Sequence, residues 1–182
     1  MSLSSVTSPP STTLYTGSYS SPSGDGTFAR VIQQQGDSET ISTIRTSSAG
    51  KTTTNQTTII DNTDGTVTRD STSTNAQGQT VQRDLTLGVS QGGTRSVSGT
   101  VTDSDGSDDQ VSGTIAATSN GFNEALSLSN SSGQTATSNV AYAQAGSVDT
   151  NSVTGTNFLG GAINQQTSAT TLSTLNLGDL VV

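Results

Sequence analysis

The segment Thr80–Ser90, with the sequence TVQRDLTLGVS, alternates between two kinds of side chain. Its even-numbered positions hold Thr, Gln, Asp, Gly and Ser, and its odd-numbered positions hold Val81, Arg83, Leu85, Leu87 and Val89. Because successive side chains of a β-strand point to opposite faces, this period of two predicts a strand with one drier face.

Similar segments lie on both sides of this one. Toward the C-terminus the alternation recurs in residues 94–103, 110–118, 122–130 and 134–144. Toward the N-terminus, the segments rich in β-branched Thr, Ile and Val are 27–35, 40–47, 52–60 and 66–74. Since β-branched side chains fit a pleated surface, we predict an all-β chain of about nine or ten strands.

Turn-forming residues separate these segments at regular intervals of 12 to 15 residues, a repeat of about 14. The glycines that mark the turns are Gly36, Gly50, Gly65, Gly78, Gly92, Gly106, Gly121 and Gly133. Asn or Asp beside Gly is typical of β-hairpins. The pattern therefore predicts an antiparallel meander that closes as a sandwich or a barrel. A β-solenoid is the alternative with similar spacing.

The composition predicts a thin core. The chain of 182 residues has 31 Ser and 34 Thr, about 36% of its length, but only 34 Leu, Ile, Val and Phe, about 19%. So few large apolar residues usually indicate disorder. Their alternate positions on evenly spaced strands indicate thin sheets with Ser and Thr faces instead. We infer a subunit that gains further burial against its neighbours.

The missing residue types exclude several classes of site. The chain has no Cys, His or Trp, so it has no disulfide, no thiolate or imidazole catalyst and no zinc site of the usual type. With 6 basic and 14 acidic residues and a net charge of −8, it lacks the clustered Lys and Arg that bind nucleic acid. No spacing brings two acids together as a catalytic pair, so we expect no enzyme activity.

We divide the chain into three parts. Residues 1–24 contain all three prolines and read as a flexible arm and a candidate docking strand, in which Tyr15 and Tyr19 interrupt a Ser- and Thr-rich background. Residues 25–160 form the β domain, and residues 161–182 form a C-terminal segment.

The acidic turn between residues 103 and 109 is a candidate calcium site. Its four carboxylates are those of Asp103, Asp105, Asp108 and Asp109. Calcium binds several oxygen ligands on a tight loop, and this turn partly resembles an EF-hand or thrombospondin-type loop. Val101 and Ser112 stand where an EF-hand has acidic ligands, so a solvated hairpin turn is the alternative. A poorer second candidate contains Asp61, Asn62 and Asp64.

Three arginines share the strand face of the apolar residues. Arg69, Arg83 and Arg95 have the same parity as the valines and leucines of their own segments. We expect these inward arginines to pair with acidic groups across the sheet or to lie at a sheet end.

The chain ends in Asp179-Leu180-Val181-Val182, one acidic residue followed by three aliphatic ones. This ending resembles the uncleaved C-terminal export signal of proteins secreted by bacterial type I systems, which an ABC transporter recognises. The resemblance covers about the last 20 to 25 residues and implies an extracellular or cell-surface location. The chain lacks the Gly-Gly-x-Gly-x-Asp nonapeptides of the calcium-binding members. Its start lacks the features of a secretory signal peptide, and no window is apolar enough for a membrane span.

Two functions from different classes fit these features. The first is an extracellular structural protein that assembles with itself through β-sheet contacts into a filament, sheath or biofilm-matrix fibre. The second is a secreted adhesin or carbohydrate-binding module that binds a cell-surface or matrix polysaccharide through its exposed Ser, Thr and Asn residues. Neither function needs a cofactor other than the candidate calcium ion.

Overall fold

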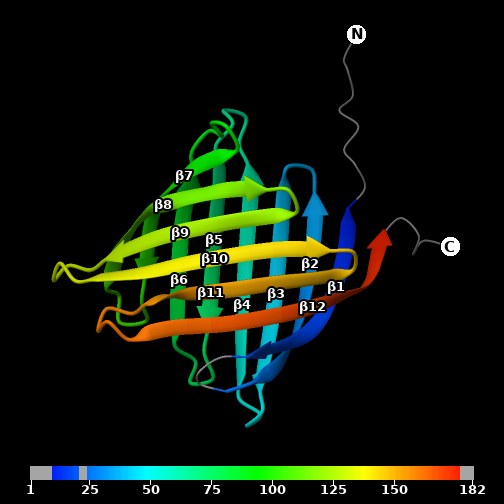
Figure 1. The fold of residues 1–182 in the computed structure, drawn as a ribbon, viewed down its shortest axis with the longest axis horizontal. Helices are drawn as coiled ribbons and strands as arrows, with labels where there is room; N and C mark the ends of the chain where they lie inside the picture. Colours follow the sequence, from blue (N-terminus) through cyan, green and yellow to red (C-terminus); the bar gives the residue numbers. More distant parts are fainter. Residues whose placement is uncertain (1–9, 21–23, 177–182) are drawn as a thin grey trace.

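The computed structural model describes residues 10–20 and 24–176, with side chains described up to residue 170. Over these ranges the chain forms twelve antiparallel strands that close into one barrel (Figure 1). The strands are β1 (Ser11–Ser20), β2 (Gly26–Gln35), β3 (Ser38–Ser47), β4 (Thr52–Asp61), β5 (Val67–Thr74), β6 (Thr80–Leu87), β7 (Thr94–Thr102), β8 (Asp108–Thr118), β9 (Gly121–Ser129), β10 (Thr135–Ala145), β11 (Val148–Thr156) and β12 (Ala162–Asn176).

Each strand pairs with the next one along the chain, and β12 pairs back onto β1. Figure 1 shows β9–β12 crossing in front of β3–β6 at a steep angle, so the barrel has a front layer and a back layer. Because every strand has two neighbours, the sheet has no free edge within the described ranges. The predicted all-β antiparallel meander is therefore confirmed, and it closes as a barrel rather than as a sandwich or a solenoid.

The two ends of the chain belong to the barrel, which corrects the predicted boundaries at residues 24 and 161. Ser11–Ser20 is a strand paired with β2 and β12 of the same chain, and not a free arm. Ala162–Asn176 is likewise a full strand. These two strands and β11 (Val148–Thr156), which matches none of the predicted segments, raise the number of strands above the predicted nine or ten. The export-like terminus lies outside the described residues.

The aromatic side chains explain why the N-terminal segment joins the sheet. Gly17 lies opposite Phe28 in the register of β1 with β2, and Tyr19 lies opposite Gly26. Each glycine thus leaves space beside the ring of its partner, and Phe28 is almost fully buried. A Ser- and Thr-rich strand can therefore still present aromatic surface to the interior.

The interior of the barrel has one apolar half. Its buried cluster consists of Val67, Leu85, Leu87, Val97, Val101 and Val111, all from β5–β8. Ile59, Val81, Ile115, Leu126 and Leu128 pack around this cluster. The segment around Leu85 therefore supplies the centre of the core, as its alternation predicts.

The outer face of the barrel is rich in hydroxyl and carboxamide groups. On β6 and β7 the exposed positions that alternate with the core are Thr80, Gln82, Asp84, Thr86, Thr94, Ser96 and Ser98. Few large apolar side chains are exposed on the described strands, and Ile44, at 51% exposure, is one of them. The described residues include no helix that could cross a membrane.

The hairpin turns owe their shape to Asn and Gly. In the turn between β5 and β6, Asn75 Oδ1 accepts hydrogen bonds from the backbone N–H groups of Gln77 and Gln79, both at 3.0 Å. Gly78 in this turn has a φ of 80°, which glycine adopts at low cost. Asn130 forms the same two contacts in the turn between β9 and β10. These local contacts produce the repeat of about 14 residues seen in the sequence.

Candidate functional site

All five arginines of the chain lie on the inner face of the barrel. Each is partly buried and stands two positions from a buried inner-face residue of its own strand. The pairs are Arg30 with Phe28, Arg45 with Thr43, Arg69 with Val67, Arg83 with Leu85, and Arg95 with Val97. The inward orientation predicted for Arg69, Arg83 and Arg95 is confirmed, and Arg30 and Arg45 share it.

Two of these arginines have strong structural partners. Arg69 forms an ion pair with Glu124 of β9, with 2.5 Å between Nη2 and Oε1. Arg95 Nη1 donates hydrogen bonds to the backbone carbonyls of Gly65 and Gly88 at 2.7 and 2.8 Å. These two side chains therefore hold the fold together, in the cross-sheet and sheet-end roles expected for them.

Arg30 and Arg45 line a shared cavity of about 550 Å³, which we call the arginine cavity. It opens at the end of the barrel where the β5–β6 and β7–β8 turns lie. Its lining residues are Arg30, Thr43, Arg45, Thr53, Thr54, Asn55, Ser73, Thr74, Asn75, Gln79, Val81, Asp103 and Ser104. Apart from the two arginines and Asp103, these side chains are uncharged and most of them are polar.

The electrostatics of the arginine cavity are unfavourable for its cations. Burial lowers the pKa of Arg45, and the positive charge of Arg30 lowers it further. Burial also lowers the pKa of the neighbouring Arg83, as does the charge of Arg69, while Asp103 and Glu124 oppose the shift. Arg30 and Arg45 therefore share a cavity whose lining holds a single carboxylate, that of Asp103.

The polar half of the interior also holds buried acceptors. Asp149 Oδ1 and Asn151 Oδ1, both on β11, are buried without a hydrogen-bond partner among the described residues. Burial, followed by the charge of Asp149 and a hydrogen bond with it, raises the pKa of Tyr142 to about 12. The Tyr142 hydroxyl therefore stays protonated at neutral pH and bonds to the buried carboxylate.

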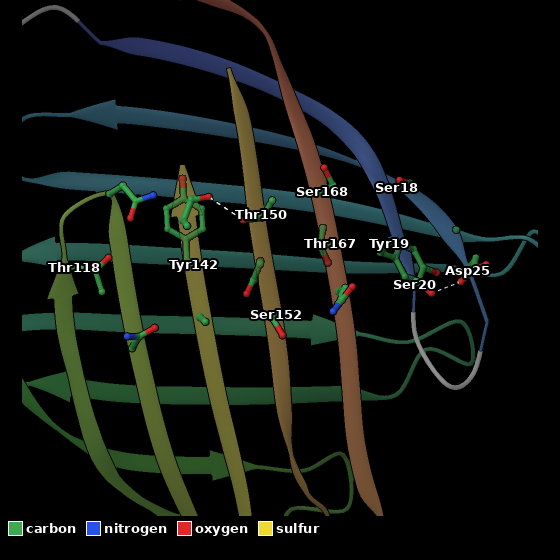
Figure 2. Close-up of a pocket in the computed structure, with 17 residues that line it drawn as sticks. Ser18, Tyr19, Ser20, Asp25, Thr118, Tyr142, Thr150, Ser152, Thr167 and Ser168 are labelled. Carbon is green, nitrogen blue, oxygen red and sulfur yellow. Dashed lines mark hydrogen bonds between the residues drawn. The ribbon is translucent and has the colours of Figure 1, made fainter. Parts of the chain in front are cut away.

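A second cavity, of about 790 Å³, lies across the outside of β8–β12 and β1, and we call it the outer groove (Figure 2). The outward-facing side chains along it, all exposed except the half-buried Ser152, are hydroxyls and carboxamides, with small alanines between them. They are Ser18, Ser20, Asn120, Asn123, Thr118, Thr150, Ser152, Gln166 and Ser168. Tyr142, Asn151, Thr167 and Tyr19 also border the groove, although their strand positions alternate with the exposed ones.

Hydrogen bonds order parts of the outer groove. Thr150 Oγ1 donates to the carbonyl of Ala143 at 3.3 Å, and Ser20 Oγ donates to Asp25 Oδ1 at 2.6 Å (Figure 2). Asp25 is the one charged side chain of the lining. A smaller cavity of about 280 Å³ continues from the groove over β8–β11 and shares Asn123, Ala141 and Ser152 with it. The groove is thus long, shallow and almost uncharged.

The acidic turn does not gather its four carboxylates. Asp105 Oδ1 accepts hydrogen bonds from the backbone and hydroxyl of Ser107, and Asp108 Oδ1 accepts one from Thr102. Asp109 is buried on the inner face, whereas Asp103 lines the arginine cavity. Among the described residues no cluster of three acidic side chains is placed to hold a metal ion. Calcium binding by this turn stays an untested prediction.

Arg30 and Arg45 were missed as site residues in the sequence. The signal that identifies them is parity, because Arg30 shares the face of Phe28 and Ile32 in the segment 27–35. Parity predicts that each of these arginines faces inward, but the sequence does not predict that both line the same cavity.

Comparison with known proteins gives no relative for this chain. No family model matches it, no curated protein matches it, and no solved structure matches it. The function of this chain is therefore inferred from its two cavities.

Proposed function

We propose that this protein is an extracellular binding module that holds an uncharged carbohydrate chain in the outer groove. The observation that carries the proposal is the lining of that groove, where exposed hydroxyl and carboxamide groups surround a cavity of about 790 Å³ and Asp25 is the one charged side chain. Sugar hydroxyls both donate and accept hydrogen bonds, as do the side chains of Ser, Thr, Asn and Gln. The chemistries therefore match without charge.

The length of the groove favours a polymer over a single sugar. The groove crosses six neighbouring strands, β8–β12 and β1. At about 4.8 Å between strands, this crossing spans roughly 24 Å. Its continuation over β8–β11 adds further polar surface. A ligand that follows the groove is therefore an extended chain with several sugar units.

The polar outer face of the barrel is suited to contact with water, as this role requires. A strand surface that faces lipid is apolar, whereas these strands expose Thr, Ser, Asn and Gln. The extracellular location expected from the sequence is part of this proposal. The cell-surface or matrix polysaccharides expected from the sequence are the natural ligands of this class.

Self-assembly into a fibre is less well supported and stays a prediction. Strand addition needs an unpaired sheet edge, and every described strand already has two partners. Electron microscopy of the purified protein tests this function separately. Ordered polymers would favour the fibre, and a monomer at high concentration would favour the binding module.

Binding to neutral polysaccharides tests the proposed function. Ser152 lies in both the groove and its continuation, so Ser152→Arg fills the site with a long side chain. We expect the natural protein to be retarded in gels containing a neutral polysaccharide, and Ser152→Arg to lose at least about tenfold in affinity, or about 1.4 kcal/mol.

The matched control is Ser98→Arg. Ser98 is exposed on the outer face of β7, outside the lining of the groove. This variant changes the charge equally and should bind like the natural protein. Equal losses in both variants, or no binding across a panel of neutral glycans, would contradict the proposal.

A further inference from the structure

The arginine cavity presents two guanidinium groups without the carboxylate partners that buried arginines usually have. The ion pair of Arg69 with Glu124 is the one salt bridge within the described ranges. Arg30 and Arg45 line the same cavity, and the charge of one acts on the other. Placing two like charges together in a partly buried site is unfavourable unless an anion offsets them.

Contacts within the fold orient both groups and leave donors free. Arg30 Nε donates to Thr43 Oγ1 at 3.2 Å, and its guanidinium carbon lies 5.7 Å from the centre of the Phe28 ring. The guanidinium carbon of Arg45 lies at the same distance from the Tyr19 ring. A guanidinium group has five N–H donors, so most donors of both residues remain available to a ligand. The rings hold the two groups in place before a ligand arrives.

Asp103 does not neutralise the pair. It lines the cavity from the β7–β8 turn, and its charge acts on Arg83. Among the lining residues, the two cations Arg30 and Arg45 therefore face one carboxylate. The excess of positive charge is notable in a protein with a net charge of −8.

The size and the remaining lining define the ligand. About 550 Å³ is within the range of small-molecule sites and much larger than an inorganic ion requires. Thr43, Asn55 and Ser73 of the strands and Gln79 of the β5–β6 turn supply hydroxyl and carboxamide groups, whereas both ends of the Asn75 carboxamide are bonded within the turn. We propose that the arginine cavity binds the oxyanion of a small, polar organic molecule, of the class of a sugar acid or a sugar phosphate. The arginines bind the oxyanion, and the amides and hydroxyls bind the rest.

Isothermal titration calorimetry on the full chain at low ionic strength tests this site. The probes are glucuronate, glucose 6-phosphate, inorganic phosphate and neutral glucose. We expect glucuronate or glucose 6-phosphate to bind at least about tenfold more tightly than glucose. Tighter binding of glucuronate would indicate a carboxylate ligand, and tighter binding of glucose 6-phosphate would indicate a phosphate ligand. Equal binding of all four probes, or no binding of either organic anion, would overturn the proposal.

Variants place the binding at the arginine cavity. Arg45→Gln should weaken binding of the better anion at least about tenfold, and Arg45→Lys should weaken it less because it keeps the charge but loses the planar group. Lys51→Gln is the control, because it removes one positive charge from the exposed β3–β4 turn at the same end of the barrel. Equal losses in Arg45→Gln and Lys51→Gln would show a general charge effect and refute the site.

Two further measurements separate a loss of anion binding from unfolding and from effects on the outer groove. Circular dichroism of Arg45→Gln checks that the barrel still forms, and Arg30→Gln offers an independent second variant if it does not. Ser152→Arg in the outer groove should leave anion binding unchanged. Anion binding and polysaccharide binding therefore succeed or fail separately.

Discussion

Arg69 of β5 and Glu124 of β9 form an ion pair through the interior of the barrel, although β6, β7 and β8 separate their strands in the sheet. The two side chains are 22% and 7% exposed. In Figure 1, β5 belongs to the back layer and β9 to the front layer. This ion pair therefore ties the two layers together from the inside.

Breaking the ion pair should destabilise the barrel strongly. In Glu124→Gln the charge of Arg69 stays inside the barrel without its carboxylate, and loss of one partner of a buried pair costs about 3 kcal/mol or more. Urea denaturation followed by circular dichroism measures this loss. The double variant Arg69→Met with Glu124→Leu removes both charges and should recover most of the stability. A double variant as unstable as Glu124→Gln would contradict this explanation.

The apolar half of the interior should dominate stability despite the small number of aliphatic residues. Leu85 is 3% exposed at the centre of the core cluster, so Leu85→Ala should cost about 2–5 kcal/mol. Ile44 points outward and is 51% exposed, so Ile44→Ala should cost less than about 1 kcal/mol. Chemical denaturation of both variants tests the contrast, and similar losses would place the core elsewhere.

Gly113 should be sensitive to even one added methyl group. A Cβ atom at this position would come within 2.1 Å of the Ala125 carbonyl oxygen and 2.9 Å of Leu126 Cα on β9. These are backbone atoms of the neighbouring strand, so they cannot move aside as a side chain does. Gly113→Ala should therefore lose about 1–3 kcal/mol. Ser112→Ala, at the exposed outer position beside it, serves as the control in thermal melting and should be close to neutral.

Removing the charge of Glu39 should stabilise the protein at neutral pH. Burial and, to a lesser degree, the charge of Asp61 raise the pKa of Glu39 above its ordinary value of 4.5. The folded protein therefore favours the protonated form of Glu39 more than the unfolded chain does. The resulting stabilisation is complete below the unfolded-state pKa and is lost as the pH rises through the folded-state pKa. Glu39→Gln should therefore melt at a higher temperature than the natural protein at pH 7. Asp37→Asn, in the exposed turn nearby, should show no such gain.

The barrel should lose stability in strong alkali through Tyr142. Its pKa is raised from 10 to about 12, mainly by burial and next by Asp149. The stability from the neutral hydroxyl is complete below pH 10 and is lost as the pH rises toward 12. Denaturation at a series of alkaline pH values measures this loss. In Tyr142→Phe the loss over this interval should be smaller, and an unchanged pH profile would assign it to other groups.

Much of the fold was predictable because its signals are local. The alternation around Leu85, the Asn and Gly turns and the inward parity of Arg69, Arg83 and Arg95 depend only on neighbours in the chain. The strand count fell short because β1, β11 and β12 carry weaker signals. In β1, Tyr15 and Tyr19 occupy inner positions within a Ser- and Thr-rich segment, and their partners for pairing lie at the opposite end of the chain.

The sequence by itself determined strands β2–β10, their turns and the faces on which their side chains lie, because these follow from the period of two and from turn chemistry. Only the tertiary structure decided that β1 pairs with β12, that Arg69 meets Glu124, and that Arg30 and Arg45 share one cavity. Those relationships depend on the register and closure of the whole sheet. The closure of the barrel depends on the offsets between all twelve pairs of neighbouring strands. No short segment of the sequence therefore determines it.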